Sequence, residues 1–171
     1  MKKAKDNGKD STAWMDMLAS KDGMLRQKAR EALVKLGKPA VPSLIQALKP
    51  SQPDQVRWEA AKALSAIGDV RSIPALVDTL EDRESGVAWL AAEALHHFNQ
   101  VAWVPLLQAL VERGTNSVPL RQGAHHVLNK QEGNRFNDVL AALLKALESK
   151  TVPEATAVAA LAFLKRVETE T

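Results

Sequence analysis

The 171-residue sequence contains no cysteine and no tyrosine, and aromatic residues make up only 4% of it. Without cysteine there can be no disulfide, no thiolate metal site and no cysteine nucleophile, and a reducing compartment such as the cytoplasm is the simplest expectation. No stretch approaches about 18 uninterrupted apolar residues, and the opening MKKAKDNGKD lacks the apolar core of a signal peptide. We therefore expect a cytoplasmic chain with no cleavable signal and no membrane insertion.

A strong charge of one sign is also lacking. The net charge is +3, but residues 2–10 hold four Lys and two Asp, so this tail supplies +2 and the remainder only +1. A nucleic-acid binder usually concentrates Lys and Arg in a stripe that displaces counterions from phosphates, and no such stripe is evident. Hydrophobic residues at 46% and charged residues at 25% are typical of a folded globular domain.

The most informative feature of the sequence is an internal repeat of 31 to 33 residues. The segments that superimpose are Leu25, Arg26, Ala29, Leu33 and Gly37; Val56, Arg57, Ala60, Leu64 and Gly68; Val87, Ala88, Ala91, Leu95 and Asn99; Leu120, Arg121, Ala124 and Leu128; and Pro153, Glu154, Ala157 and Leu161. Apolar residues at offsets 0, 4, 7, 8 and 11 of each segment fall on one face of an α-helix. Each segment is therefore predicted to be an amphipathic helix.

A second apolar segment follows each of the first three and begins Val41-Pro42, Ile73-Pro74 and Val104-Pro105. Proline is tolerated in the first turn of a helix, where its missing N–H costs least. Gly37 and Gly68 stand just after the first helices, where a left-handed cap favours glycine. The unit is thus a helix pair, although the fourth copy, residues 143–147, has lost the proline.

These patterns predict an all-α fold, a right-handed α-solenoid of stacked antiparallel helix pairs with about ten helices. The predicted boundaries are a lone helix at 11–20, repeats at about 24–50, 54–82, 85–113 and 118–149, and a final helix at 152–167. A flexible basic tail at 1–10 and a short tail at 168–171 flank the repeat domain, which spans 11–167.

The residue pattern of the repeat resembles that of the short HEAT-like repeats in bilin lyase subunits. The resemblance rests on Val56-Arg57, Ala60-Ala61-Lys62-Ala63-Leu64, Ile67-Gly68-Asp69 and Ile73-Pro74-Ala75-Leu76, and it is strongest over 25–110. It implies the solenoid fold. It also implies a possible role as the accessory subunit of a cofactor-attaching lyase, on the basis of fold analogy alone.

The residue types that catalysis requires do not gather in a recognisable motif. No glycine-rich phosphate loop is present. The pairs His96-His97 and His125-His126 cannot chelate a metal singly, because adjacent helical residues diverge by about 100°. Deoxyhypusine hydroxylase, built from similar repeats, carries iron-binding His-Glu pairs where this chain has Gln27-Lys28, Trp58-Glu59, Trp89-Leu90 and Gln122-Gly123. We therefore expect no enzyme, no cofactor and no metal.

Two tryptophans mark the first candidate binding surface. Trp58 and Trp89 occupy the same repeat position, about 200° around the helix from the buried face, so both are predicted to project outward. His96 lies two turns beyond Trp89 on the same side. Two neighbouring exposed indoles form the kind of apolar patch that binds a partner. The alternative is that the rings only cover the seam between repeats.

The second candidate surface is a polar ladder on the second helices, which we expect to line the concave side. Its members are Asp16, Gln46, Asp78, Gln108 and Lys145, with Trp103 as a possible aromatic anchor. Stacked repeats place such side chains about 10 Å apart, a spacing that suits a helix or an extended peptide. The alternative is that these polar residues simply face water.

A recurring arginine, present as Arg26, Arg57 and Arg121, is given a structural role, bonding acidic groups or helix-end carbonyls of a neighbour. The function predicted from the sequence is a non-catalytic protein–protein interaction or scaffold module that binds a peptide or a folded partner. Two alternatives stay open: an accessory subunit of a bilin-lyase-like enzyme, and a weak nucleic-acid-binding protein.

Overall fold

Ten α-helices make up most of the chain that the computed structural model describes, which comprises residues 7–129, 131, 135–149 and 152–170. They are α1 (Asn7–Met17), α2 (Gly23–Leu36), α3 (Val41–Ala47), α4 (Asp54–Ile67), α5 (Ile73–Thr79), α6 (Ser85–His97), α7 (Trp103–Arg113), α8 (Val118–Leu128), α9 (Asn137–Glu148) and α10 (Glu154–Thr169). Short 3₁₀ turns, η1 (Lys38–Ala40), η2 (Val70–Ser72) and η3 (Asn99–Ala102), lead into α3, α5 and α7. These described residues contain no strand.

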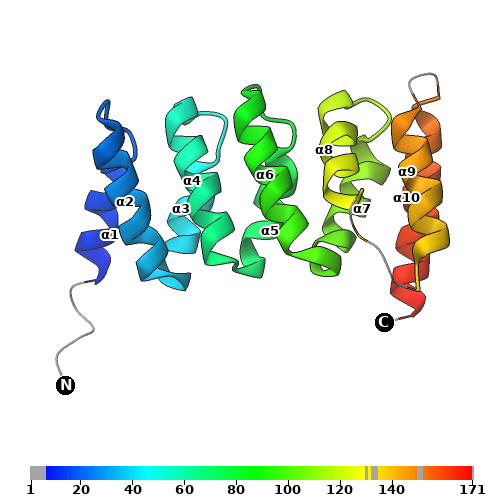
Figure 1. Ribbon diagram of the computed structural model, residues 1–171, viewed down its shortest axis with the longest axis horizontal. Coiled ribbons are helices and arrows are strands. Elements are labelled where there is room, and N and C mark those ends of the chain that lie inside the picture. The colour runs from blue at the N-terminus through cyan, green and yellow to red at the C-terminus, as the bar shows by residue number, and fades with distance from the viewer. Residues whose placement is uncertain (1–6, 130, 132–134, 150–151, 171) are drawn as a thin grey trace.

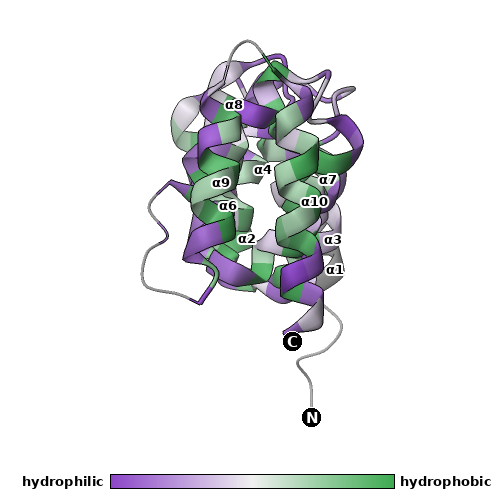
Figure 2. Cartoon of the chain, turned by 90° about the vertical axis from the view of Figure 1, so that its right-hand side faces the viewer, coloured by the Kyte–Doolittle hydropathy of each residue, from purple (hydrophilic) through white to green (hydrophobic). Residues whose placement is uncertain are grey.

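The helices stand side by side in two layers (Figure 1). Seen from the end of the row, α2, α4, α6, α8 and α9 form a first layer, and α1, α3, α7 and α10 lie in a second (Figure 2). The helix α5 joins the second layer through its contacts with α6 and α7. Each helix touches mainly its partner in the other layer and its neighbours along the row. The predicted all-α solenoid of stacked helix pairs is thereby confirmed.

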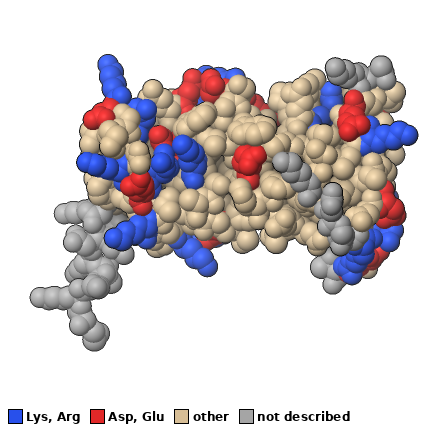
Figure 3. All heavy atoms as spheres, viewed as in Figure 1, with Lys and Arg blue, Asp and Glu red and all other residues tan. Residues whose placement is uncertain are grey.

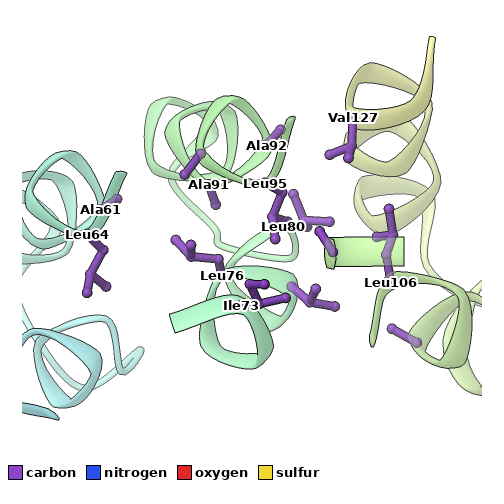
Figure 4. Packing of buried hydrophobic residues seen from close by; sticks show 14 of the residues in the cluster. Ala61, Leu64, Ile73, Leu76, Leu80, Ala91, Ala92, Leu95, Leu106 and Val127 are labelled. Atoms are coloured by element: carbon purple, nitrogen blue, oxygen red, sulfur yellow. The ribbon is translucent and has the colours of Figure 1, made fainter. Parts of the chain in front are cut away.

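Small residues on the first helices let the layer pack closely. The alanines at offset 4 of the repeat, Ala29, Ala60, Ala91 and Ala124, are all completely buried. The leucines four residues further along are equally buried, and they meet apolar side chains of the second layer. Figure 4 shows Leu95 of α6 and Leu76 and Leu80 of the α5 segment converging between the layers. The core is therefore one continuous apolar slab that repeats with the helix pairs.

Three of the first helices, α2, α4 and α6, are followed by a residue with a positive φ angle. Gly68, with φ 65° and ψ 29°, has the left-handed conformation predicted for the cap, whereas Gly37 combines a φ of 72° with a ψ of −135°. Asn99 takes the same place after α6 with φ 51°, the single positive φ of a non-glycine residue among the described residues. Asparagine tolerates this conformation better than most side chains do. The third repeat thus keeps the geometry of the turn although it has lost the glycine.

The recurring arginine holds consecutive repeats together, as predicted. Arg57 is completely buried. Its Nε and Nη2 donate to the two carboxylate oxygens of Asp82 at 2.6 and 2.7 Å, and its Nη1 donates to the carbonyl of Gln52 at 2.6 Å. The hydrogen bonds with Asp82 raise the pKa of Arg57 above its usual value, although burial acts in the opposite direction. One side chain therefore joins the segment before α4 to the segment after α5.

The equivalent arginines make the same kind of contact with carbonyl groups. Arg26 Nη1 donates to the carbonyls of Ser20 and Lys21, just after α1, at 2.8 and 3.2 Å. Arg121 Nη1 donates to the carbonyl of Gly114 at 2.6 Å, just after α7. Each arginine thus donates to carbonyl groups of the segment that follows the preceding second helix. Ala88 stands at this position in the third repeat.

The helix boundaries predicted at the two ends are wrong by a few residues. The helix α1 begins at Asn7, so the tail extending to residue 10 is shorter than predicted, and residues 1–6 lie outside the described part of the chain. At the other end, α10 continues to Thr169. The inner boundaries differ from the predicted ones by only a few residues.

The arrangement of the last helices departs from the predicted repeat. We expected α9 to be a second helix, but it lies beside α8 in the first layer, and α10 takes the place beside α7 (Figure 2). The physical reason lies in an aromatic cluster. The ring of Trp103 on α7 is 5.0 Å from that of Phe163 on α10 and 5.8 Å from that of Phe136 at the start of α9. Burying these rings requires α10 to pack on α7.

The buried guanidinium predicts a large loss of stability on truncation. Arg57→Ala should lower the free energy of unfolding by about 3–5 kcal/mol, because it leaves the Asp82 carboxylate buried without its counter-ion. Arg26→Ala is the matched control, since that side chain is partly exposed, bonds carbonyl groups and lies 3.6 Å from Glu59, which keeps its shorter ion pair with Arg30. A loss of about 1 kcal/mol is expected. Urea denaturation measures both. Equal losses of stability in the two variants would contradict the larger contribution that we assign to the ion pair of Arg57 with Asp82.

The positive φ angle of Asn99 predicts a loss of stability on substitution that is smaller than that of Arg57→Ala and arises from backbone strain. Asn99→Ala should lower the free energy of unfolding by about 1 kcal/mol, because a β-carbon opposes a positive φ more strongly in alanine than in asparagine. Asn129→Ala, at the end of α8 where φ is −60°, should change it by less than about 0.5 kcal/mol. Thermal unfolding of both variants tests this. An unaltered unfolding midpoint for Asn99→Ala would contradict the expected strain of alanine at this position.

Candidate functional site

Both candidate tryptophans reach the surface of the first layer. Each is the fifth residue of its helix, Trp58 in α4 and Trp89 in α6. The side chains are not equally free, because Trp58 is 37% exposed and Trp89 is 54% exposed. Their different surroundings explain this difference.

Trp58 covers the seam between α4 and α6. A β-carbon built on Gly86 would come within 2.2 Å of Cζ3 of the indole, so the ring lies directly against the glycine at the start of α6. Lys62, one turn along α4, places its ammonium group 5.9 Å from the ring centroid. Most of the apolar area of Trp58 is therefore used within the molecule, in agreement with the seam alternative.

Trp89 stands at the edge of a hollow between α6 and α8. Its ring stacks on that of His126 with centroids 4.2 Å apart and planes inclined by 46°. The hollow has a volume of about 400 Å³. Its apolar walls are formed by Leu80, Ala88, Trp89, Ala92, Pro119 and Gly123. Ala88 occupies the repeat position that arginine fills elsewhere, so the absence of a long side chain there helps to leave this space open.

A polar cluster lies next to Trp89 and joins the same two helices. His126 Nε2 lies 2.5 Å from Oε1 of Glu93, and His96 Nδ1 lies 3.1 Å from the carbonyl oxygen of Val127. The rings of His96 and His126 are 6.4 Å apart. Two of the predicted site residues, Trp89 and His96, are thus brought together around His126.

Glu93 and His126 are not among the site residues predicted from the sequence. A signal was present, because the two positions are separated by 33 residues, the same shift that relates the third and fourth repeats. They therefore occupy equivalent places on neighbouring first helices, and stacking makes such places adjacent.

No group of three or more His, Cys, Asp or Glu side chains in the described part of the chain is arranged to hold a metal ion. Over the same residues, no helix has the length and apolar character needed to cross a bilayer.

All five predicted ladder residues are exposed, and four of them, Asp16, Gln46, Asp78 and Gln108, lie on helices of the second layer. Asp78 is joined to Arg113 on α7 by an ion pair of 3.0 Å. A hollow of about 260 Å³ lies beside it between α3 and α5, with Ile45, Leu48 and Ala75 among its lining residues. The ladder therefore borders a smaller and less aromatic recess than the one beside Trp89.

Two members assigned to the second-layer surface do not belong there. Trp103 is only 1% exposed, and its indole N–H donates to Oε1 of Gln131 at 2.5 Å, so it is a core residue and cannot anchor a partner. The reason is the packing of α10 on α7, which covers the ring. Lys145 is exposed, but it lies on α9 in the first layer, away from the other ladder residues.

Charged side chains on the first-layer face occur largely as pairs of opposite sign. Figure 3 shows Lys and Arg mixed with Asp and Glu toward the ends of this face, and few charges in its middle. Asp54 pairs with Arg83 at 3.0 Å, and hydrogen bonds from Arg83 and then Arg57 lower the pKa of its carboxyl group. Hydrogen bonds from Arg71 likewise lower the pKa of Asp69 to about 2. No continuous basic stripe is visible.

Helix pairs stacked in two layers around a repeating apolar slab define the protein as an α-solenoid. A family model of HEAT repeats matches residues 11–96, about half of the chain, and the chain belongs to the HEAT repeat family. Repeats of this family generally mediate protein interactions.

One relative with an assigned role is similar to part of the chain. It is the phycocyanobilin lyase subunit alpha of Picosynechococcus sp., which is 31% identical over 99 residues. The aligned segment covers 54% of this chain and 37% of that subunit. The chain thus matches little more than a third of the length of this relative, which is itself a subunit of a lyase.

The contact between Trp58 and Gly86 predicts that Gly86→Ala destabilises the protein when Trp58 is present and stabilises it when Trp58 is replaced by alanine. Gly86→Ala should lower the free energy of unfolding by about 1–3 kcal/mol, because the added methyl group forces the indole away. In a Trp58→Ala background the same substitution should stabilise the protein by about 0.5–1 kcal/mol, because alanine is the better helix former. The measurement is urea denaturation of the intact protein, the two single variants and the double variant, which together form a double-mutant cycle. If the effect has one sign in both backgrounds, the indole does not lie on Gly86.

Proposed function

We propose that the chain is a non-catalytic protein-interaction module, and that the hollow beside Trp89 is its main contact surface. The observation that carries this proposal is a 54% exposed indole at the edge of an apolar recess of about 400 Å³. A large aromatic side chain beside a pocket is the usual core of a protein interface. Membership of a repeat family that generally mediates protein interactions supports the same function.

The recess suits a partner that inserts one apolar side chain and surrounds it with polar groups. The walls contributed by Ala88, Ala92 and Gly123 are small and apolar, whereas Arg83 and Gln122 lie at the margin. A peptide or a folded partner with an exposed aliphatic or aromatic residue would bury the free part of the Trp89 ring. Trp58 contributes less, because much of its ring already packs on Gly86.

Removal of the indole should release the partner. Affinity capture from the source cell with the intact protein should recover a stoichiometric protein, and Trp89→Ala should weaken its binding by at least about tenfold, the loss typical of a hot-spot aromatic residue. The measurement is a titration of the purified partner followed by calorimetry. Trp58→Ala should weaken binding less.

Gln27→Ala is the matched control, because Gln27 occupies the same repeat position on α2 and is exposed. It should leave the affinity unchanged. If Trp89→Ala binds the partner as tightly as the intact protein, the contact lies elsewhere, and substitutions at Gln46 and Gln108 would then test the second-layer ladder. The predicted cytoplasmic location is part of this proposal.

The similarity to the phycocyanobilin lyase subunit supports one alternative function. Under it, the chain would be an accessory subunit of a cofactor-attachment enzyme. A linear tetrapyrrole or its acceptor protein would then bind, and absorbance titration would show a spectral change. An unchanged spectrum together with no binding of the acceptor would remove this alternative. Weak nucleic-acid binding, the remaining alternative, gains no support from the mixed charges of the described surface.

A further inference from the structure

The outer side of α10 exposes apolar residues that the repeat pattern would bury. Leu161 aligns with leucines that are completely buried in the other repeats, Leu33, Leu64, Leu95 and Leu128, yet it is 40% exposed. Val158, on the same side of α10, is 69% exposed. These two side chains are consequently left without the neighbour that a further helix would provide.

The position of α10 in the stack explains this exposure. Figure 2 looks onto the end of the row formed by α9 and α10, and no described helix covers this end. Three small apolar residues of the same two helices, Ala141 and Ala142 on α9 and Ala162 on α10, are exposed as well. Solenoids normally close such an end with a polar surface, which makes an apolar one unusual for an isolated molecule.

The exposed stripe of α10 has a regular pattern of four residues, Glu154, Val158, Leu161 and Lys165. Their spacing of four, three and four positions is that of the seam in a helix pair, and it confines them to an arc of about 60°. The acidic residue lies at one end, the basic residue at the other, and the apolar pair between them. When a second copy of the helix runs in the opposite direction, its basic residue therefore faces the acidic residue of the first copy. The apolar residues of the two copies then face each other.

We propose that α10 pairs antiparallel with α10 of a second copy of the chain, about a twofold axis between Ala159 and Ala160. This arrangement sets Val158 opposite Leu161 of the second copy, and Glu154 opposite Lys165. The complementary charges occur twice because the interface is isologous. Neither Glu154 nor Lys165 forms an ion pair with a described residue of its own chain.

The opposite end of the stack is a poor match for this stripe. The exposed side of α2 carries Gln27, Lys28, Glu31 and Lys35, so a head-to-tail arrangement would place charged groups against Val158 and Leu161. Pairing of two like ends buries both apolar stripes at once. The contact is small, and the dimer should be weak, with a dissociation constant on the order of 10–100 µM.

Sedimentation equilibrium of the full chain over roughly 5–500 µM tests the dimer directly. The expected result is a reversible rise from monomer to dimer mass. Leu161→Glu should shift the midpoint at least about tenfold to higher concentration, because it buries a charge in the apolar centre. A monomer over the whole range, or a dimer that Leu161→Glu leaves unaltered, would overturn the proposal.

A charge exchange tests the antiparallel register. Glu154→Lys and Lys165→Glu should each weaken self-association at least about fivefold, because each sets like charges face to face twice. An equimolar mixture of the two variants should associate again, since every facing pair then has opposite signs. Lys28→Glu at the other end of the stack is the control and should leave the midpoint unchanged. Failure of the mixture to associate would exclude this register.

Discussion

Burial of the Arg57 guanidinium is the interaction on which the stacking of the central repeats depends. A completely buried cation is costly unless its donors are satisfied, and here Asp82 accepts from two nitrogens while Gln52 accepts from the third. These partners lie on either side of the second repeat. The orientation of α4 relative to its neighbours is therefore set by a directional contact and not by apolar packing alone.

The same position explains why one seam of the solenoid differs from the others. Arg26 and Arg121 donate to carbonyl groups in the segments that follow the preceding second helices, whereas Ala88 has no side-chain donor to do so. The space beside Ala88 becomes part of the hollow next to Trp89. A single departure from the repeat thus removes a structural contact and provides a recess at the surface, which is where we place the binding function.

Trp58 and Trp89 show how equivalent residues acquire different roles. Both occupy one repeat position, but the ring of Trp58 lies directly against a glycine of the next helix. Trp89 meets His126, which is itself held by Glu93, and therefore remains more exposed. The functional difference arises from the facing residue of the neighbouring repeat and not from the tryptophan. No described helix lies beyond α10 at the end of the row, and the apolar stripe of α10 is exposed.

Local patterns in the sequence determined the helices and the glycines Gly37 and Gly68 that follow two of them, because these depend on residues within one or two turns. The structural role of the recurring arginine could be predicted because the residue returns at the same position of the repeat. Tertiary structure alone decided the burial of Trp103, the layer occupied by α9 and the exposure of Leu161. These three depend on which helix lies alongside, and the choice of α10 as the neighbour of α7 followed from the packing of Trp103, Phe136 and Phe163. Periodicity specifies which face of a helix is apolar, but it does not specify what that face will meet.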